Sequence, residues 1–173
     1  MFDELGIVLR RIFQENFQRK TDENILFLTD VIASENQTKL SSRKQELILN
    51  RAKFVELLSI RARDLYGQDQ VNFLTYPSTL RHGAEPPSYL INEIKRNHIF
   101  LAITSYSITY TEVLKSCLKF GVRGASIPLG TPEMFKEQSS ICVDTQSLQM
   151  KGEALLKKIN CIKSQNQTRT CKV

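Results

Sequence analysis

Two short apolar stretches decide the fold: residues 24–29 read Asn-Ile-Leu-Phe-Leu-Thr, and residues 98–104 read His-Ile-Phe-Leu-Ala-Ile-Thr. Neither stretch alternates apolar with polar residues, and strands that are apolar throughout are typical of parallel sheets covered on both faces. Polar residues follow each stretch, Asp30 after the first and Ser105 after the second. We therefore expect two buried strands whose polar carboxyl ends lie at one edge of a sheet.

Helical patterns alternate with strand patterns along the rest of the chain. Apolar residues recur at spacings of three and four over residues 2–17 and again over residues 42–66, as on one face of an amphipathic helix. Further helices are predicted over 88–96, in a segment that ends at 120, in a segment that begins at 131, and around 148–159. Further strands are predicted over 71–75 and 124–128 and in a segment that begins at 168. This alternation predicts an α/β fold, an open and mainly parallel sheet of about four to five strands with helices on both faces.

Helix ends can also be predicted. Capping-box spacing puts one N-cap at Ser42 and another at Thr109. Gly67 and Gly121 follow helical patterns in the position where glycine commonly ends a helix. The stretch 34–40, which precedes the helix predicted over 42–66, is polar and is expected to form a loop.

Composition limits the domain organisation and the class of protein. The chain has 173 residues, 41% of them hydrophobic and 24% charged, which suits a single domain over 1–173. No apolar run approaches the about 18 residues of a membrane span. The first residues, with Asp3 and Glu4, lack the pattern of a signal peptide, so a cytoplasmic location is expected. The net charge of +6 comes from basic residues dispersed among Glu and Gln, which indicates solvated helix faces rather than a nucleic-acid surface.

Motifs for common chemistries are missing from the sequence. It has no CxxC pair, no GxGxxG after the first strand and no P-loop. Of the two histidines, His82 in a proline-rich loop is expected at the surface, and His98 is expected to be structural. Asp30 and Glu85 both follow strands and could form a carboxylate pair, although cap and turn roles are favoured for them. From these residues no active site can be assembled.

Three loop segments carry a more specific signal. Residues 80–87 read Leu-Arg-His-Gly-Ala-Glu-Pro-Pro, residues 103–111 read Ile-Thr-Ser-Tyr-Ser-Ile-Thr-Tyr-Thr, and residues 120–134 read Phe-Gly-Val-Arg-Gly-Ala-Ser-Ile-Pro-Leu-Gly-Thr-Pro-Glu-Met. In this order they resemble the N-terminal domain of the thermophilic metallo-aminopeptidases of the aminopeptidase T and S type, the leucyl aminopeptidases. Those proteins have a Gly-x-Glu-Pro-Pro loop, a Ser-Leu-Ser-His-Thr segment and a Gly-Ala-Arg…Ser-Met-Pro-Gly-Ile-Thr segment. The resemblance covers about residues 24–173.

The resemblance implies a structural or ligand-binding role for a set of loop residues: Arg81, Gly83, Glu85, Pro86, Pro87, Ser107, Thr109, Thr111, Gly121, Arg123, Ser126 and Pro128. The chain departs from the pattern at Tyr110, where the family has His, and at Leu129, where it usually has Gly. The family's two divalent metal ions, zinc or cobalt, are held by ligands in a second half that this sequence does not contain. No catalytic residue, cofactor or metal ligand can therefore be carried over to this chain.

The function implied by the resemblance is metal-dependent removal of N-terminal amino acids from peptides. This chain would be an N-terminal fragment or degenerate member of that family, inactive alone, with a second copy or a missing catalytic half as partner and a peptide as substrate only if that half is present. Two alternatives stay open: a non-enzymatic interaction module, and a small-ligand or nucleotide-binding domain that uses the carboxyl-edge loops. The hydroxyls that follow residues 98–104 either line a ligand site or cap a helix, and capping is favoured; they are Ser105, Ser107, Thr109 and Thr111.

Overall fold

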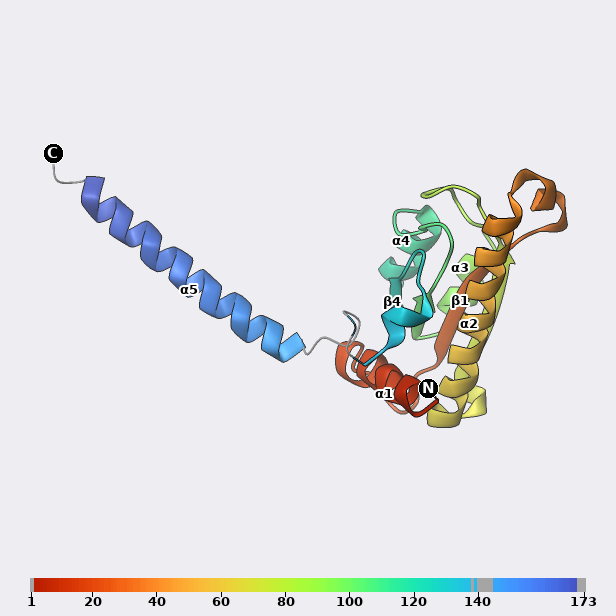
Figure 1. Ribbon diagram of the computed structural model, residues 1–173. Helices are drawn as coiled ribbons and strands as arrows, with labels where there is room; N and C mark the ends of the chain where they lie inside the picture. The colour runs from red at the N-terminus through yellow and green to blue at the C-terminus, as the bar shows by residue number, and fades with distance from the viewer. Residues whose placement is uncertain (1, 138, 140–144, 171–173) are drawn as a thin grey trace.

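A four-stranded parallel sheet forms the centre of the protein in the computed structural model, which describes residues 2–137, 139 and 145–170 (Figure 1). The strand order is β2-β1-β3-β4. The strands are β1 (Ile25–Val31), β2 (Val71–Pro77), β3 (Ile99–Ala102) and β4 (Arg123–Ser126). The predicted α/β fold with an open parallel sheet is confirmed.

The strand order creates a switch point between β1 and β3. After β1 the chain passes to β2 on one side of it, and β3 then pairs with the other side of β1. Ile25 is paired with Val71 in β2 and with Ile99 in β3, so the three strands start in line, and β3 ends at Ala102 beside Leu28 of β1. In open α/β sheets a crevice forms outside the carboxyl ends of the strands at such a point, and ligands bind there.

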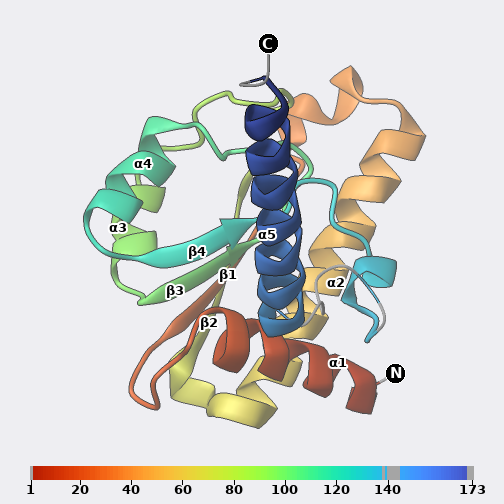
Figure 2. The ribbon, with the colours of Figure 1, turned by 90° about the vertical axis from the view of Figure 1, so that its left-hand side faces the viewer.

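Helices cover both faces of the sheet, as Figure 2 shows. On one face α1 (Phe2–Arg10), a π-helical turn η1 (Arg11–Asn16) and α2 (Ser42–Tyr66) pack on one row of strand side chains, which includes Phe27. On the other face α3 (Leu90–Lys95) and α4 (Glu112–Lys119) pack on the alternate row, which includes Leu26, Leu28 and Phe100. Successive strand residues point to opposite faces, and both rows are apolar, so β1 and β3 are buried on both sides.

The second face of the sheet has one unusually close contact. Phe100 in β3 is 1% exposed and lies against Gly124, its partner in β4. A β-carbon added to Gly124 would lie 2.3 Å from two atoms of the Phe100 ring. Only glycine leaves room for the ring at this position.

Several predicted boundaries differ from the structure. The helix predicted from residue 131 is only a short 3-10 turn, η4 (Pro132–Phe135), and the polar segment 34–40 contains a second such turn, η2 (Ser34–Lys39). The N-cap of α2 is Ser41 rather than Ser42, because the Ser41 carbonyl accepts the first helical bond, from the N–H of Gln45. The Gln45 side chain donates to the carbonyls of Gln37 and Leu40, so no capping box forms. Gly67, with a φ of 106°, ends α2 as predicted.

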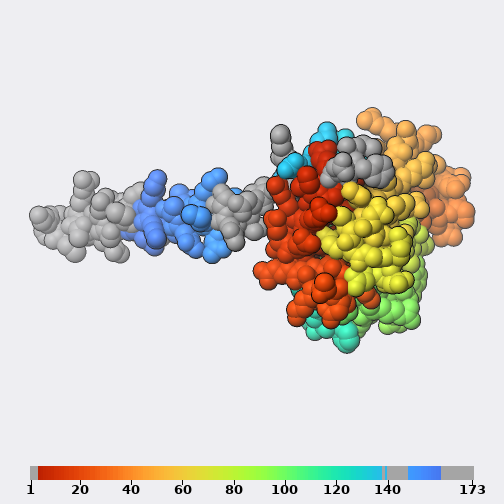
Figure 3. Space-filling view, turned by 90° about the horizontal axis from the view of Figure 1, so that it is seen from below, coloured from red at the N-terminus to blue at the C-terminus, as the bar shows by residue number. Residues whose placement is uncertain are grey.

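The C-terminal helix α5 (Thr145–Thr170) contains the predicted last helix and extends well beyond it. The strand predicted from residue 168 is therefore wrong for 168–170, while 171–173 lie outside the described residues. All described side chains from 148 to 160 are exposed, and in Figure 3 this helix extends away from the rest of the molecule. Among the helices of the described residues, none is both long enough and apolar enough to cross a membrane.

Candidate functional site

Asp30 marks the switch point at the carboxyl edge of the sheet. It is the sixth residue of β1 and is 1% exposed. Its Oδ2 accepts a hydrogen bond of 2.6 Å from the Ser78 hydroxyl, and its Oδ1 accepts one of 2.6 Å from the backbone N–H of Ser105. Ser78 follows β2 and Ser105 follows β3, so this single carboxylate ties together the loops of three adjacent strands.

Arg51 approaches the same point from α2 and is 8% exposed. Its Nη1 donates to the Ser105 hydroxyl at 2.6 Å, and its Nε donates to the carbonyl of Gly130 at 3.2 Å. Burial lowers the pKa of the guanidinium, and the neighbouring Asp30 carboxylate opposes this fall. Ser105 therefore lies between a buried carboxylate and a buried guanidinium (Asp30 and Arg51).

The guanidinium of Arg51 has no carboxylate in direct contact. Its hydrogen-bond acceptors are a hydroxyl and a carbonyl, and no ion pair joins it to Asp or Glu within the described residues. Buried charges in proteins are ordinarily paired because leaving water is costly for an ion. A buried cation that has only neutral direct partners is suited to receive an anion.

A cavity of about 260 Å³ opens beside this guanidinium. It is lined by cationic and polar side chains together with an aliphatic wall: Lys44, Leu47, Ile48, Arg51, His82, Ser105, Tyr106 and Leu129. The cavity is at the edge of the sheet where the strand order predicts a ligand site, and we call it the carboxyl-edge cavity.

His82 adds a donor to this cavity. Its Nδ1 accepts a hydrogen bond of 3.0 Å from the backbone N–H of Ser107, and its ring lies edge-on to Tyr106 with centroids 5.4 Å apart. A neutral imidazole whose Nδ1 is an acceptor has its proton on Nε2. His82 is exposed, as the sequence predicted, but it also lines the cavity.

Glu85, in the loop that follows β2, binds the N-terminus of α4. Its Oε1 accepts from the N–H of Glu112 at 2.7 Å and its Oε2 from the N–H of Val113 at 3.4 Å. A carboxylate at this place is favoured by the unpaired N–H groups and the dipole of α4. The cap role favoured for Glu85 is confirmed. Asp30 binds Ser78 and Ser105 instead of lying beside Glu85, so the two residues are not a carboxylate pair.

Capping also explains one of the hydroxyls that follow β3. Thr111 is the N-cap of α4, accepting from the N–H of Leu114 and donating to the carbonyl of Ile108 at 2.7 Å. The cap predicted at Thr109 was therefore wrong by two residues. The Thr109 hydroxyl lies 3.0 Å from that of Ser107, and both residues are in the turn before the helix.

The three segments that resemble the aminopeptidases converge on the carboxyl edge. The N–H of Gly83 donates to the carbonyl of Ser107 at 2.8 Å, and the N–H of Leu129 donates to the carbonyl of Thr104 at 2.7 Å. Two residues of the set lie at the opposite edge, because Gly121 ends α4 and Arg123 begins β4. None of the set lines the carboxyl-edge cavity. Ser126 is the last residue of β4, and the others follow the carboxyl ends of β2, β3 and β4: Arg81, Gly83, Glu85, Pro86, Pro87, Ser107, Thr109, Thr111 and Pro128.

The residues that do line the cavity were mostly missed. The charge pattern predicts a solvated helix face for Lys44 and Arg51; Lys44 is exposed as predicted, whereas Arg51 is buried. The signal for Arg51 was its position, since it follows Ile48 by three residues and precedes Val55 by four, and both are on the buried face of α2. A basic residue on an apolar stripe predicts a buried charge with a specific partner. Asp30 had been noted as a polar residue at the end of β1.

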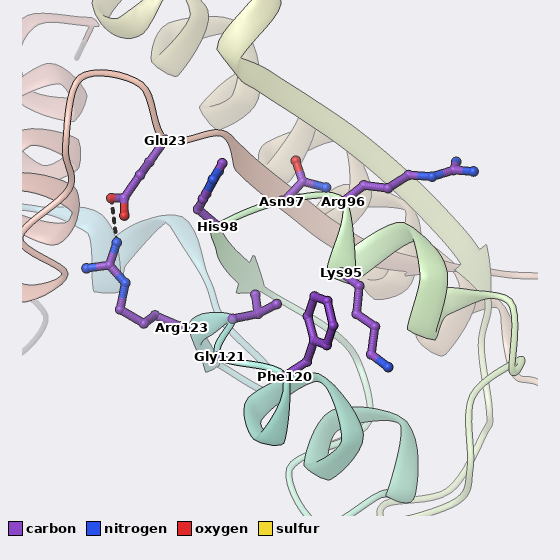
Figure 4. Close-up of a pocket in the computed structure, with 9 residues that line it drawn as sticks. Glu23, Lys95, Arg96, Asn97, His98, Phe120, Gly121 and Arg123 are labelled. Atoms are coloured by element: carbon purple, nitrogen blue, oxygen red, sulfur yellow. Dashed lines mark hydrogen bonds and ion pairs between the residues drawn. The ribbon is translucent and has the colours of Figure 1, made fainter.

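A second pocket of about 220 Å³ lies at the amino edge of the sheet, and Figure 4 shows its side chains. Its charged groups have partners: Arg123 bonds to Glu23 at 2.5 Å, Arg96 bonds to Glu93 at 2.8 Å, and the Nζ of Lys95 lies 4.9 Å from the centre of the Phe120 ring. His98 accepts the N–H of Asn24 at 3.0 Å, which agrees with the structural role expected for it.

Glu23 in this second pocket is ionised at neutral pH. Burial raises its pKa, but the hydrogen bond from the N–H of Lys20 and the Arg123 guanidinium together lower it by more, so the pKa lies below its ordinary value. This pocket is consistent with a structural network that joins the start of β4 to the segment before β1. We therefore take the carboxyl-edge cavity as the candidate site.

Within residues 2–137, 139 and 145–170, no three His, Cys, Asp or Glu side chains gather closely enough to hold a metal ion. The donors in the described part of the chain do not fit a divalent metal pair, so no step through a metal is assigned to them. Comparison of the chain with protein families, curated proteins and solved structures finds no significant match.

Proposed function

We propose that this chain is a binding domain that takes a small anionic ligand in the carboxyl-edge cavity. The observation that carries the proposal is Arg51, a guanidinium that is 8% exposed, lines the cavity and has no carboxylate in direct contact. An anion in the cavity would supply the missing direct counter-charge. Such charge-assisted bonds to arginine are about twice as strong as neutral ones.

Two further features support an anion at this place. Lys44, in the first turn of α2, adds a second cation to the lining, and His82, whose Nδ1 accepts a hydrogen bond, adds an N–H donor at Nε2. The cavity also lies at the switch point between β1 and β3, the usual ligand position of open α/β sheets. A mostly apolar cavity into which a small number of polar groups converge is typical of small-molecule sites.

Titration of the purified chain with acetate and with inorganic phosphate tests this proposal, with calorimetry and melting temperature as readouts. We expect saturable binding that is lost in Arg51→Met and weakened about tenfold in Lys44→Met, each lost charge-assisted bond costing about 1.5–3 kcal/mol. Arg43→Met is the matched control, because Arg43 is exposed on the same turn of α2 and does not line the cavity. Lys44 is also exposed, so its variant keeps the test valid if Arg51→Met does not fold. Binding that is equal in all three variants, or no binding, would overturn the proposal.

As a second candidate we propose that the chain is the N-terminal domain of an aminopeptidase-T-like protein whose metal ligands come from elsewhere. The observation that favours it is the meeting of the three resembling segments at one edge, through the Gly83–Ser107 and Leu129–Thr104 backbone bonds. The test is the intact mass and the hydrolase activity of the native protein from its own cells, assayed with aminoacyl anilides and zinc or cobalt. Activity in a species heavier than 19.9 kDa that contains this sequence would support the candidate, and an inactive species of 19.9 kDa would exclude it.

A further inference from the structure

Leu129, which lines the carboxyl-edge cavity, has an unusual backbone conformation. Its φ is +60°, in the left-handed region that a β-carbon disfavours. Two hydrogen bonds hold the segment: the N–H of Leu129 donates to the carbonyl of Thr104 at 2.7 Å, and the carbonyl of Gly130 accepts from the Arg51 side chain at 3.2 Å. Glycine would adopt this conformation without strain, so a leucine here implies that its side chain has a use.

The Leu129 side chain belongs to the apolar wall of the cavity. It is 53% exposed, as is Leu47 from α2, and Ile48, which also lines the cavity, is 4% exposed. The same cavity is also lined by the buried guanidinium of Arg51. A cavity with a cation on one part of its lining and accessible aliphatic side chains on another suits a ligand with an anionic head and an aliphatic tail.

The charges favour a single negative charge on that head. Asp30 offsets part of the Arg51 charge from the other side of Ser105, and Lys44 adds a second positive charge to the lining. A phosphate dianion would bring excess negative charge close to Asp30. Two of the five N–H groups of the Arg51 guanidinium bind the Gly130 carbonyl and the Ser105 hydroxyl. The planar shape of a guanidinium matches that of a carboxylate, which can accept from the remaining N–H groups.

We propose that the ligand of this site is a monocarboxylate with a short aliphatic chain, and that Leu129 determines this specificity. The inference rests on the proposed anion-binding function and adds the class of ligand. The cavity of about 260 Å³ is smaller than the roughly 300–1,000 Å³ typical of sites for drug-sized molecules, which limits the chain to a few carbons.

Calorimetric titration with acetate, isocaproate, isocaproamide and inorganic phosphate tests the specificity. Burial of one methylene is worth about fourfold in affinity, so a partly open cavity should bind isocaproate at least about tenfold more tightly than acetate. Isocaproamide, which has the same tail without the charge, should bind at least about tenfold more weakly than isocaproate, and phosphate should bind more weakly as well.

The variant Leu129→Gly removes the side chain at a position whose backbone suits glycine, so the protein should stay folded. Isocaproate binding should fall about fivefold or more while acetate binding stays the same. The control is Leu80→Gly, the same substitution at another leucine of positive φ (58°) that does not line the cavity. This control should bind isocaproate as the unchanged protein does.

The outcomes separate this inference from the function on which it rests. If Arg51→Met removes all binding but isocaproate binds no better than acetate or phosphate, the specificity is wrong and the anion site stands. If Leu129→Gly and Leu80→Gly bind isocaproate equally, Leu129 is not the determinant. If no carboxylate or phosphate binds, the proposed function itself fails.

Discussion

The contact between Gly124 and Phe100 gives the sharpest test of the fold. In Gly124→Ala the new methyl group would lie 2.3 Å from the Phe100 ring, where ordinary contacts begin at 3.4 Å. The ring is 1% exposed and packs among α3, α4 and the neighbouring strands, so it has little room to move. The substitution should therefore force the ring or β4 out of position.

The expected cost follows from the size of this overlap. Adding one carbon to a filled core costs about 1–3 kcal/mol in free energy of unfolding. The φ of Gly124 lies outside the positive region, so alanine itself suits the backbone, and its smaller entropy in the unfolded chain offsets about 0.4–1 kcal/mol. At the middle of both ranges the net loss is about 1.3 kcal/mol, which for a chain of this size lowers the melting temperature by roughly 3–5 °C.

Thermal and urea unfolding of Gly124→Ala, Phe100→Leu and the double variant would measure this effect. The double variant should be more stable than the sum of the two single costs predicts, because leucine leaves space for the new methyl group. Gly152→Ala is the control: Gly152 is in α5 with nothing within 4 Å of an added β-carbon, so its melting temperature should not fall. A Gly124→Ala protein as stable as the unchanged one would refute the packing argument.

Three further predictions follow from groups described above. Glu23→Gln should lower the urea midpoint at pH 7, and this difference should shrink as the pH falls below the ordinary pKa of 4.5, because a carboxylate with a lowered pKa stabilises the fold only while it is ionised; a difference that does not shrink in acid would contradict the ion pair with Arg123. Thr111→Ala should cost about 1 kcal/mol by urea unfolding and Thr111→Ser much less, since only alanine removes the N-cap oxygen; equal costs would argue against the cap. Burial, opposed by Lys95, raises the pKa of the buried Cys117 thiol, so iodoacetamide should label it at least about tenfold more slowly in the folded chain than in urea, as measured by peptide mass spectrometry; equal rates would contradict its burial.

The strands of this fold could be predicted where burial alone decides the structure. Runs of apolar residues in β1 and β3 indicated strands covered on both faces, and both lie in the middle of the sheet. The alternating residues from 168 onward suggested another strand, but 168–170 continue α5. A helix satisfies its own backbone hydrogen bonds, whereas an alternating segment becomes a strand only if a partner edge is available.

The candidate site was predictable only in part, because it depends on contacts between segments far apart in the chain. The end of β1 at Asp30 marked the right edge of the sheet. The burial of Arg51 depends on which side of α2 meets the sheet and on a bond to Gly130, which local patterns do not contain. The positive φ of Leu129 is likewise set by its bond to Thr104.

The central place of β1 also affects how the protein is made. Six of its seven residues are buried in the finished fold, yet its first partner strand begins at Val71 and its second at Ile99. A ribosome adding roughly 5–20 residues per second needs about 4–15 s to make the chain between β1 and β3. During that interval an apolar strand with unpaired backbone groups is open to chaperones and to other nascent chains. The yield of folded protein should therefore depend on the speed of translation across this interval, well before the C-terminal helix is made.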